Sequence, residues 1–449
     1  MARWSVGQDL RRRNPLPEGT VAVGIGLAVT GLAAYAYLVI SARVLGPAEY
    51  GGLSVLWALV FLVGGGFFLP LEQEVGRAVA DRRARDIGSG PVVKKAAIAS
   101  IFLTAGLIVV TLLGAAFFPL VENLFHGQTV LLVCFVIALI TYAVQFLCKG
   151  TLAGNGRFGP YGVILGAEGI VRVLPLIVLV AAGIDNLTLY GLALAIPPIV
   201  AVLIAMRGQH GLMPPGPDAQ WSELSTNLTL LFLGSLAAQA LSYAAALGGI
   251  LLAKGPAQRA LVADFLVGFF IARIPILLFQ AVQAALLPKL AALASIGRLD
   301  DFRSGLRKLV IIVVGVGAFG ILCGVTIGPE VGKILFGDKF HLDRLDLGLL
   351  FTGSALFIFA LTLAQALIAL RGHGRALVAW AVGLSVAIVV TVVGNQDMFF
   401  LRASELGFLA GCGAAALVMA ILLATRMRTA GPESLTLLVE QIEHEPLEI

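Results

Sequence analysis

One charged residue interrupts the middle of a long apolar segment. Arg273 lies in the run Phe269-Phe-Ile-Ala-Arg273-Ile-Pro275, with no carboxylate three or four positions away on either side. A guanidinium is always charged, and its planar fork binds phosphate or carboxylate through two hydrogen bonds. Pro275 removes a backbone donor, so we expect a helix kink beside the arginine. Arg273 is therefore a candidate phosphate-binding residue. The alternative is an ion pair with a carboxylate of a neighbouring helix.

A second pair of charges stands in another apolar segment. Glu168 and Arg172 are four positions apart, so on a helix they share one face. A mutual ion pair would lower the cost of burying either charge, and this is the structural interpretation. In the functional interpretation the pair lines a cavity, where Glu168 contacts ligand hydroxyl groups or carries a proton.

Weaker candidates are carboxylates and amides near the same depth. Glu72 and Glu74 follow Pro70 near the end of an apolar segment, where we expect them to reach interfacial water. Five glutamines lie at or near membrane depth: Gln145, Gln239, Gln280, Gln283 and Gln365. Such amides bridge helices as readily as they contact a ligand. We take Glu74, Gln145 and Gln280 forward as candidate binding residues, together with Arg273, Arg172 and Glu168.

The composition shows which elements must hold these side chains. Of the 449 residues, 59% are hydrophobic and 13% are charged, whereas soluble domains carry about 25% charged residues. A spanning helix needs about 20 apolar residues. Twelve runs of roughly that length occur, at 20–43, 51–76, 93–118, 129–152, 158–182, 187–206, 225–253, 261–288, 308–328, 346–370, 376–394 and 402–425. The fold class is therefore an all-α polytopic membrane protein with about twelve transmembrane helices.

The basic residues predict the orientation of these helices. If the N-terminus is cytoplasmic, 22 of the 31 lysines and arginines fall on the cytoplasmic side, Lys149 and Arg82 among them. Seven fall on the opposite side, Arg402 among them. Such an excess in short loops marks the cytoplasmic face. Both termini should therefore be cytoplasmic.

Turn sequences recur in the two halves of the chain. The matched pairs are Gly46-Pro47-Ala48 with Gly255-Pro256-Ala257, Pro119-x-Val121 with Pro329-x-Val331, and Gly154-Asn-Gly-Arg157 with Gly372-His-Gly-Arg375. Chance is the alternative explanation, because such turns are common. Their common order indicates a parallel internal repeat of two six-helix lobes, related by an axis along the membrane normal.

The repeat suggests a division of the chain. We expect an N-terminal six-helix lobe at 1–206, a cytoplasmic linker at 207–227, a C-terminal six-helix lobe at 228–428 and an acidic cytoplasmic tail at 429–449. The linker contains Pro214, Pro215 and Pro217.

Several of these turns resemble a known family. The stretch Leu45-Gly-Pro-Ala-Glu-Tyr-Gly51 after the first run, Leu335-Phe336-Gly337 after the ninth, and the GxGR turns are similar to the MOP (multidrug/oligosaccharidyl-lipid/polysaccharide) exporter superfamily. Within it the chain resembles the polysaccharide-type, Wzx-like flippases of lipid-linked oligosaccharides. The relatives that flip lipid II usually carry two extra helices, which this chain lacks.

The resemblance implies an alternating-access transporter in the cell membrane. Two lobes would form a central cavity for the headgroup of a polyprenyl-(pyro)phosphate-linked sugar, while the lipid tail stays in the bilayer. The implied partners are this glycan, membrane lipid, a coupling ion (H+ or Na+) and proteins of envelope-glycan biosynthesis, with no nucleic acid. We expect no enzymatic activity and no cofactor, because nothing in the sequence resembles a catalytic site. The sequence has no GxxxxGK[ST] loop, so an ATP-driven mechanism would need another subunit.

Three other functions stay open at this point. The first is a multidrug or cation antiporter of the same superfamily, for which a cavity rich in carboxylates and aromatic residues is typical. The second is a membrane glycosyltransferase, although no large extracytoplasmic loop with paired carboxylates is present. The third is a membrane scaffold that does not transport.

Overall fold

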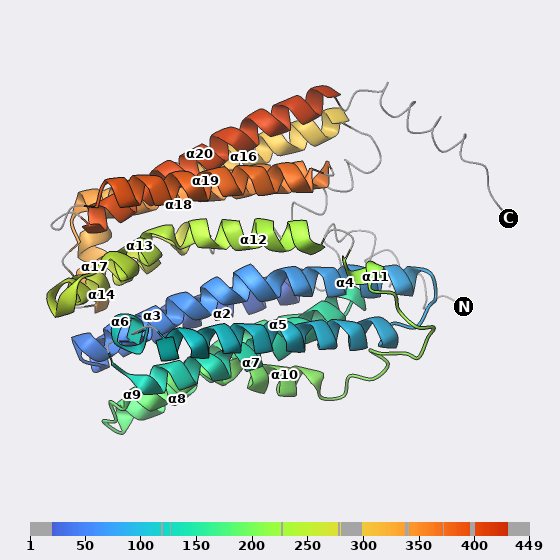
Figure 1. The fold of residues 1–449 in the computed structure, drawn as a ribbon, viewed down its shortest axis with the longest axis horizontal. Helices are drawn as coiled ribbons and strands as arrows, with labels where there is room; N and C mark the ends of the chain where they lie inside the picture. The colour runs from blue at the N-terminus through green and yellow to red at the C-terminus, as the bar shows by residue number, and fades with distance from the viewer. Residues whose placement is uncertain are drawn as a thin grey trace, which may run out of the picture.

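The computed structural model describes residues 20–117, 120–125, 127–225, 228–276, 279, 299–336, 340, 342–370, 372–395 and 400–429. Within these ranges the regular structure is helical (Figure 1). The helices of the first half are α2 (Thr20–Val44), α3 (Pro47–Val63), the π-helical turn η1 (Gly64–Phe68), α4 (Leu69–Ala84), α5 (Gly90–Phe117), α6 (Leu120–Phe125), α7 (Thr129–Gly154), α8 (Phe158–Ala181), α9 (Leu187–Ala195) and α10 (Pro197–Met206).

The short helix α11 (Ser222–Ser225) lies at the end of the linker. The helices of the second half are α12 (Leu228–Ser242), α13 (Ala244–Leu252), α14 (Gly255–Ile271), α16 (Leu299–Thr326), α17 (Gly328–Phe336), α18 (Arg344–Ala369), α19 (His373–Val393) and α20 (Phe400–Thr429).

The spans agree with the apolar runs of the sequence. Ten helices of the described chain are long and apolar enough to cross a membrane, and α12 with α13 forms an eleventh span bent by 65°. Of the twelve expected segments, only 261–288 has no such counterpart, because the described part of it ends soon after α14. Helix α14 ends at Ile271, the residue whose carbonyl loses its donor to Pro275, and the kink expected at the proline stays a prediction.

The helices of each half pack mainly on one another. Helix α2 packs along α8 and α4 along α7, while α18, α19 and α20 form the centre of the second half. The two groups form two layers in Figure 1. Small residues bring the backbones close: a Cβ built on Gly26 of α2 would lie 2.5 Å from the Gly162 carbonyl oxygen of α8. Glycine at such crossings is typical of helix packing in membranes.

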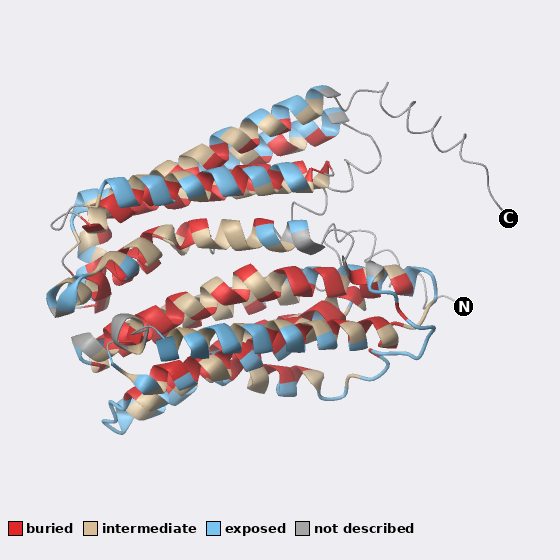
Figure 2. Ribbon diagram, viewed as in Figure 1, coloured by how far each residue is buried: buried red, intermediate tan, exposed pale blue. Residues whose placement is uncertain are grey.

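Burial separates the helices that face lipid from those that face protein. Helices α5 and α16 expose large apolar side chains such as Phe102 and Phe319, whereas α3, α7 and α18 are largely buried (Figure 2). Exposed apolar surface of this extent is costly in water and favourable in lipid. The central helices are therefore the ones that can position a site away from lipid.

The contacts between the halves come in related pairs. Ser235 of α12 donates a 2.9 Å hydrogen bond to the Gly65 carbonyl of η1, and Tyr35 of α2 donates one of 2.9 Å to the Phe270 carbonyl of α14. Each bond joins the first span of one half to the second span of the other. Helices α3 and α14, which begin at the matched Gly-Pro turns, also pack against each other. A parallel two-fold repeat predicts this pattern, and the expected domain boundaries remain a prediction.

The linker lies at the same end of the molecule as the start of α2 and the end of α20 (Figure 1). Arg82, buried at the end of α4, donates to both carboxylate oxygens of Glu223 at 2.7 and 3.0 Å and to the carbonyls of Gly88 and Pro217. Hydrogen bonds from Arg82 lower the pKa of Glu223 to about 2. Gly88 and the linker therefore share one side of the membrane, as the basic residues predict. That this side is cytoplasmic stays a prediction.

Candidate functional site

The Glu168–Arg172 pair is the centre of a buried polar network between α7 and α8. One carboxylate oxygen of Glu168 accepts hydrogen bonds from Arg172 and from the Tyr142 hydroxyl, the latter at 3.0 Å. The other accepts a 2.8 Å bond from the Gln145 amide. All four side chains are buried. The expected ion pair and the burial of Gln145 beside it are thus present, and their helical spacing on α7 and α8 produces the contact.

Arg172 is fully buried and only partly satisfied. Its guanidinium lies 5.4 Å from the Trp57 ring and 5.7 Å from the Phe61 ring, both on α3. The Nε and one terminal nitrogen have no hydrogen-bond partner. Cation–π contacts of this kind stabilise a desolvated guanidinium by about 2 kcal/mol. The aromatic partners come from a different span, so sequence spacing alone gave no indication of them.

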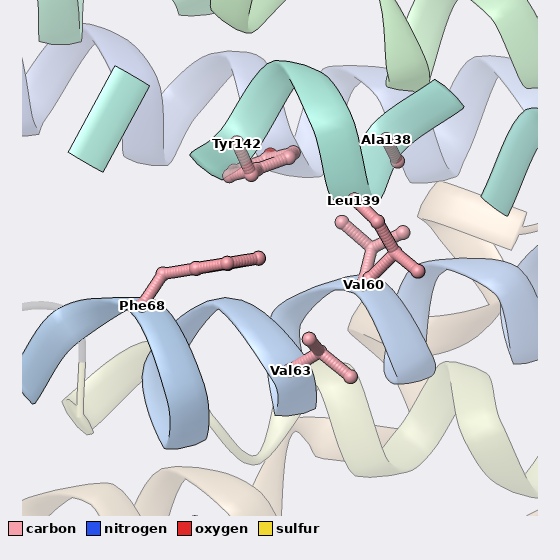
Figure 3. Close-up of a pocket in the computed structure, with 6 residues that line it drawn as sticks. All are labelled: Val60, Val63, Phe68, Ala138, Leu139 and Tyr142. Carbon is pink, nitrogen blue, oxygen red and sulfur yellow. The ribbon is translucent and has the colours of Figure 1, made fainter. Parts of the chain in front are cut away.

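A small apolar pocket adjoins this network. It lies between α3, η1 and α7, is too narrow to hold a water molecule, and is lined by Val60, Val63, Phe68, Ala138, Leu139 and Tyr142 (Figure 3). Figure 3 shows the Phe68 and Tyr142 rings facing each other across it. Of these residues, Tyr142 is the one that also contacts Glu168. Apart from the Tyr142 hydroxyl, the side chains that line the pocket are apolar, so the pocket adds no polar group to the network.

Glu72 does not reach interfacial water, because α4 continues to Ala84 and α7 covers this side chain. Its carboxylate lies 2.8 Å from the Lys149 ammonium and accepts a 2.7 Å hydrogen bond from Tyr161. Lys149 also lies 3.9 Å from the Phe146 ring centroid. Lys149, at the end of the expected segment 129–152 that is counted as cytoplasmic, is buried as well. The Glu72–Lys149 pair is therefore a second buried ion pair, one turn further along α7 than Gln145.

Glu74 is buried too, so its carboxylate is shielded from water, although it lies near the end of α4 that contacts the linker. It pairs with Arg77, three positions later on α4, whose Nε lies 3.0 Å away. Arg77 also donates to the Glu223 carbonyl, close to the linker. Glu74 therefore lies with the linker contacts and apart from Glu168 and Arg273.

Arg273 lies beside the bend between α12 and α13. It donates a 2.6 Å hydrogen bond to the Ser242 carbonyl, one of the backbone acceptors that the bend frees. Its guanidinium lies 4.2 Å from the Tyr243 ring and 5.2 Å from the Phe269 ring. No carboxylate of the described residues forms an ion pair with it. The alternative expectation, a carboxylate partner from a neighbouring helix, finds no support in the described chain.

Two glutamines of the second half, Gln280 and Gln239, differ in what the structure shows of them. Gln280 lies outside the described residues. Gln239 of α12 lies against Gly65, where an added Cβ would come within 1.5 Å of the amide nitrogen. Gly65 is part of the π-helical turn η1, and such turns frequently mark functional positions. Gln239 therefore lies at the contact between the two halves, and both bridging and ligand binding stay open for it.

Comparison with known proteins gives the fold class its context. No family model matches the chain. An uncharacterised protein of Mycobacterium tuberculosis (strain ATCC 25618 / H37Rv) is 27% identical over 376 residues, covering 80% of this chain and 82% of the relative. A second uncharacterised protein of that strain is 24% identical over 389 residues, covering 84% and 85%.

Solved structures with the same fold are transporters. A MATE protein in complex with MaD3S has a TM-score of 0.68 at 15% identity, covering 92% of this chain and 95% of that one. A multidrug resistance MATE family transporter of the MOP superfamily matches in its inward-facing form with a TM-score of 0.67 at 14% identity, covering 91% and 98%. An outward-facing structure of a multidrug resistance MATE family transporter of the MOP superfamily matches with a TM-score of 0.63 at 16% identity, covering 92% of this chain and 95% of that one. The chain is therefore a multi-pass membrane protein whose fold is that of the MATE structures.

Proposed function

We propose that this protein flips a polyprenyl-(pyro)phosphate-linked sugar across the cell membrane by alternating access, as part of envelope-glycan assembly. The fold supports movement between inward-facing and outward-facing forms. The observation that carries the choice of substrate is Arg273, a permanent cation near the contact between the halves with no carboxylate partner among the described residues.

The surroundings of Arg273 suit a phosphate ligand. Tyr243 and Phe269 hold the guanidinium by cation–π contacts, and Ser242 offers a neutral carbonyl. A cation held by neutral groups keeps its charge available for an incoming anion. A charge-assisted hydrogen bond to phosphate adds about 1.5–3 kcal/mol. That energy offsets the cost of keeping the charge at this depth, which is about 2.5–3.5 kcal/mol on insertion scales.

Arg172 and Glu168 belong to the proposal in a second role. Their pair is neutral overall, so it cannot attract an anion as Arg273 does. Glu168, Tyr142 and Gln145 can hydrogen-bond sugar hydroxyls. The Glu168 carboxylate could also bind a coupling ion, H+ or Na+. Glu74 and Gln280 remain proposed binding residues without a structural argument of their own.

The second candidate is export of cationic drugs with an ion in exchange. The observation that favours it is the buried Glu168 carboxylate beside the aromatic residues Trp57 and Phe61. Arg172 already neutralises that carboxylate, so a cationic drug would find little charge to bind. We therefore place it second.

A flipping assay in proteoliposomes tests the choice. The wild type should move a fluorescent polyprenyl-pyrophosphate-linked sugar to the outer leaflet, and Arg273→Ala should lose flipping by about tenfold to a hundredfold, following the energies above. Arg273→Lys should recover part of the rate, because an ammonium lacks the bidentate fork. Arg344→Ala, which removes an exposed arginine paired with Glu330, is the matched control.

Normal flipping by Arg273→Ala would contradict the phosphate-binding role. A wild type that exports a cationic dye and does not flip the lipid-linked sugar would favour the second candidate. Expression and melting temperature of Arg273→Ala separate loss of function from loss of fold.

A further inference from the structure

Three carboxylates and one arginine meet where α18 and α20 begin. Arg402 of α20 lies 2.6 Å from Asp346 of α18 and 3.5 Å from Asp343, the residue that caps α18. The Nε of the same guanidinium lies 4.0 Å from the Glu405 carboxylate, one turn further along α20. This end of the bundle is opposite the linker, so by the predicted orientation it faces outward.

The three carboxylates form a series from the surface inward. The side chain of Asp343 is 61% exposed, that of Asp346 22% and that of Glu405 1%. Asp346 therefore stands between bulk water and the buried Glu405. A proton that reaches Glu405 from this end of the bundle can pass by way of Asp346.

Hydrogen bonding distinguishes Glu405 from the other two. Asp343 accepts from the backbone amides of Leu345 and Asp346 at 2.8 Å each, and Asp346 accepts from the Asp343 amide at 3.1 Å. Although burial opposes it, these amide bonds hold the pKa of Asp343 below its ordinary value. Both oxygens of Glu405, in contrast, have no hydrogen-bond partner.

The charge balance at this position favours a proton. Three ionised carboxylates around one guanidinium would leave two negative charges uncompensated, one of them in the protein interior. An ionised carboxylate without partners costs several kcal/mol to bury, and protonation removes that cost. The charged groups that act on Glu405 are Asp346, Arg402 and Asp343. Helices α12 and α13 carry no charged residue in their described lengths, and the charged residues of α19, His373 and Arg375, lie at its opposite end.

We propose that Glu405 is a proton-binding site of this protein, neutral in the present conformation and in exchange with the outer water phase through Asp346 and Arg402. Binding converts the Glu405 carboxylate and one proton into the carboxylic acid and removes one negative charge. In a conformation that brings Arg402 or water against Glu405, the acid releases the proton again. As a source of coupling energy, this inference rests on the proposed transport function, whereas proton binding itself does not.

Infrared spectroscopy of the purified protein in lipid nanodiscs tests proton binding directly. At neutral pH the wild type should show the carbonyl band of a protonated carboxylic acid, and Glu405→Gln should lose the whole of that band. Glu330→Gln, at an exposed carboxylate paired with Arg344, should keep it. A band of unchanged size in Glu405→Gln would overturn the proposal.

Thermal unfolding gives a second, independent reading. A proton held by the folded protein and released on unfolding makes the wild type less stable as pH rises. Glu405→Gln mimics the neutral acid, so its melting temperature should lack this fall between about pH 5 and pH 9. An equal fall in both proteins would show that Glu405 is ionised and paired with Arg402.

The transport function can fail separately. Arg273→Ala should keep the infrared band while it loses flipping, because the two groups lie on different helices. Glu405→Gln should flip the sugar at a rate that no longer responds to an imposed pH gradient. A retained band without any response of the wild type to the gradient would leave Glu405 a proton site and would refute its coupling role.

Discussion

Neutralising Glu168 alone should destabilise the protein strongly. Glu168→Gln keeps the size of the side chain but removes the charge that balances Arg172, which is fully buried. Breaking one partner of a buried ion pair typically costs about 3–5 kcal/mol, because the other charge stays uncompensated. The cation–π contacts with Trp57 and Phe61 would return part of this, about 2 kcal/mol. We therefore expect a net loss of roughly 1–3 kcal/mol in the free energy of unfolding.

The double variant Glu168→Gln/Arg172→Met separates charge from shape. It removes both ions and leaves Tyr142 and Gln145 to bond with the new amide. It should therefore be less destabilised than Glu168→Gln alone, and the two substitutions should be strongly non-additive. The assay is reversible unfolding in mixed micelles, read as a double-mutant cycle with Arg172→Met as the fourth corner.

Additive effects, within about 0.5 kcal/mol, would refute this reasoning. They would mean that Glu168 and Arg172 do not compensate each other in the folded protein. If the double variant is stable but flips no substrate, the pair takes part in transport beyond its structural role.

Two further perturbations act on other contacts of the fold. Gly65→Ala should force η1 and α12 apart and lower the population of this conformation, because the new Cβ meets Gln239. Spin-label distances across the halves measure this, with Gly106→Ala, which meets no atom within 4 Å, as the control that should change nothing. The lowered pKa of Glu223 means that its bond to Arg82 stabilises linker docking fully above about pH 4.5 and loses this as pH falls towards 2. Glu223→Gln should remove roughly 1–3 kcal/mol of that docking, seen as faster hydrogen exchange at 207–221, and an unchanged rate would contradict it.

The spans were largely predictable because every helix that crosses the bilayer needs about 20 mostly apolar residues. Hydropathy found eleven of the segments, and spacing on α8 gave the Glu168–Arg172 pair. The partners of that pair were not predictable, since Tyr142 and Trp57 reach it from other spans. Contacts across spans depend on tertiary packing, which carries no local pattern.

The surroundings of two charged residues near the ends of spans differ from the expectation. Glu72 and Lys149 lie inside the expected segments 51–76 and 129–152, near the ends where charged side chains ordinarily reach interfacial water. In the structure both side chains are buried, and each charge is compensated by the other. Hydropathy cannot distinguish a charge in water from a charge paired with another span.

Glu405 was missed although the rule that singled out Arg273 applies to it. It stands near the start of the expected segment 402–425, three positions after Arg402, and was not among the candidate residues. The structure places the Arg402 guanidinium on Asp346 instead, so Glu405 is buried with both oxygens unsatisfied. Asp346 and Glu405 compete for the Arg402 guanidinium, and Asp346 lies closer to it. This competition arises only because α18 packs against α20, so the sequence around Glu405 does not show it.

The placement of charge differs between the two halves. In the first half each buried charge is compensated, Glu168 by Arg172 and Glu72 by Lys149, so neither pair gains much from an added ion. In the described part of the second half, Arg273 has no carboxylate partner, and Glu405 has no hydrogen-bond partner. An uncompensated charge costs stability unless a ligand meets it, and the ligand then recovers the energy. By the proposals above, the second half would bind an anion at Arg273 and a proton at Glu405, while the compensated groups around Glu168 in the first half would meet sugar hydroxyls or a coupling ion. The anion at Arg273 and the proton at Glu405 carry opposite charges and would bind at different depths of the second half. If each ligand favours a different packing of the helices there, binding of one changes the affinity for the other.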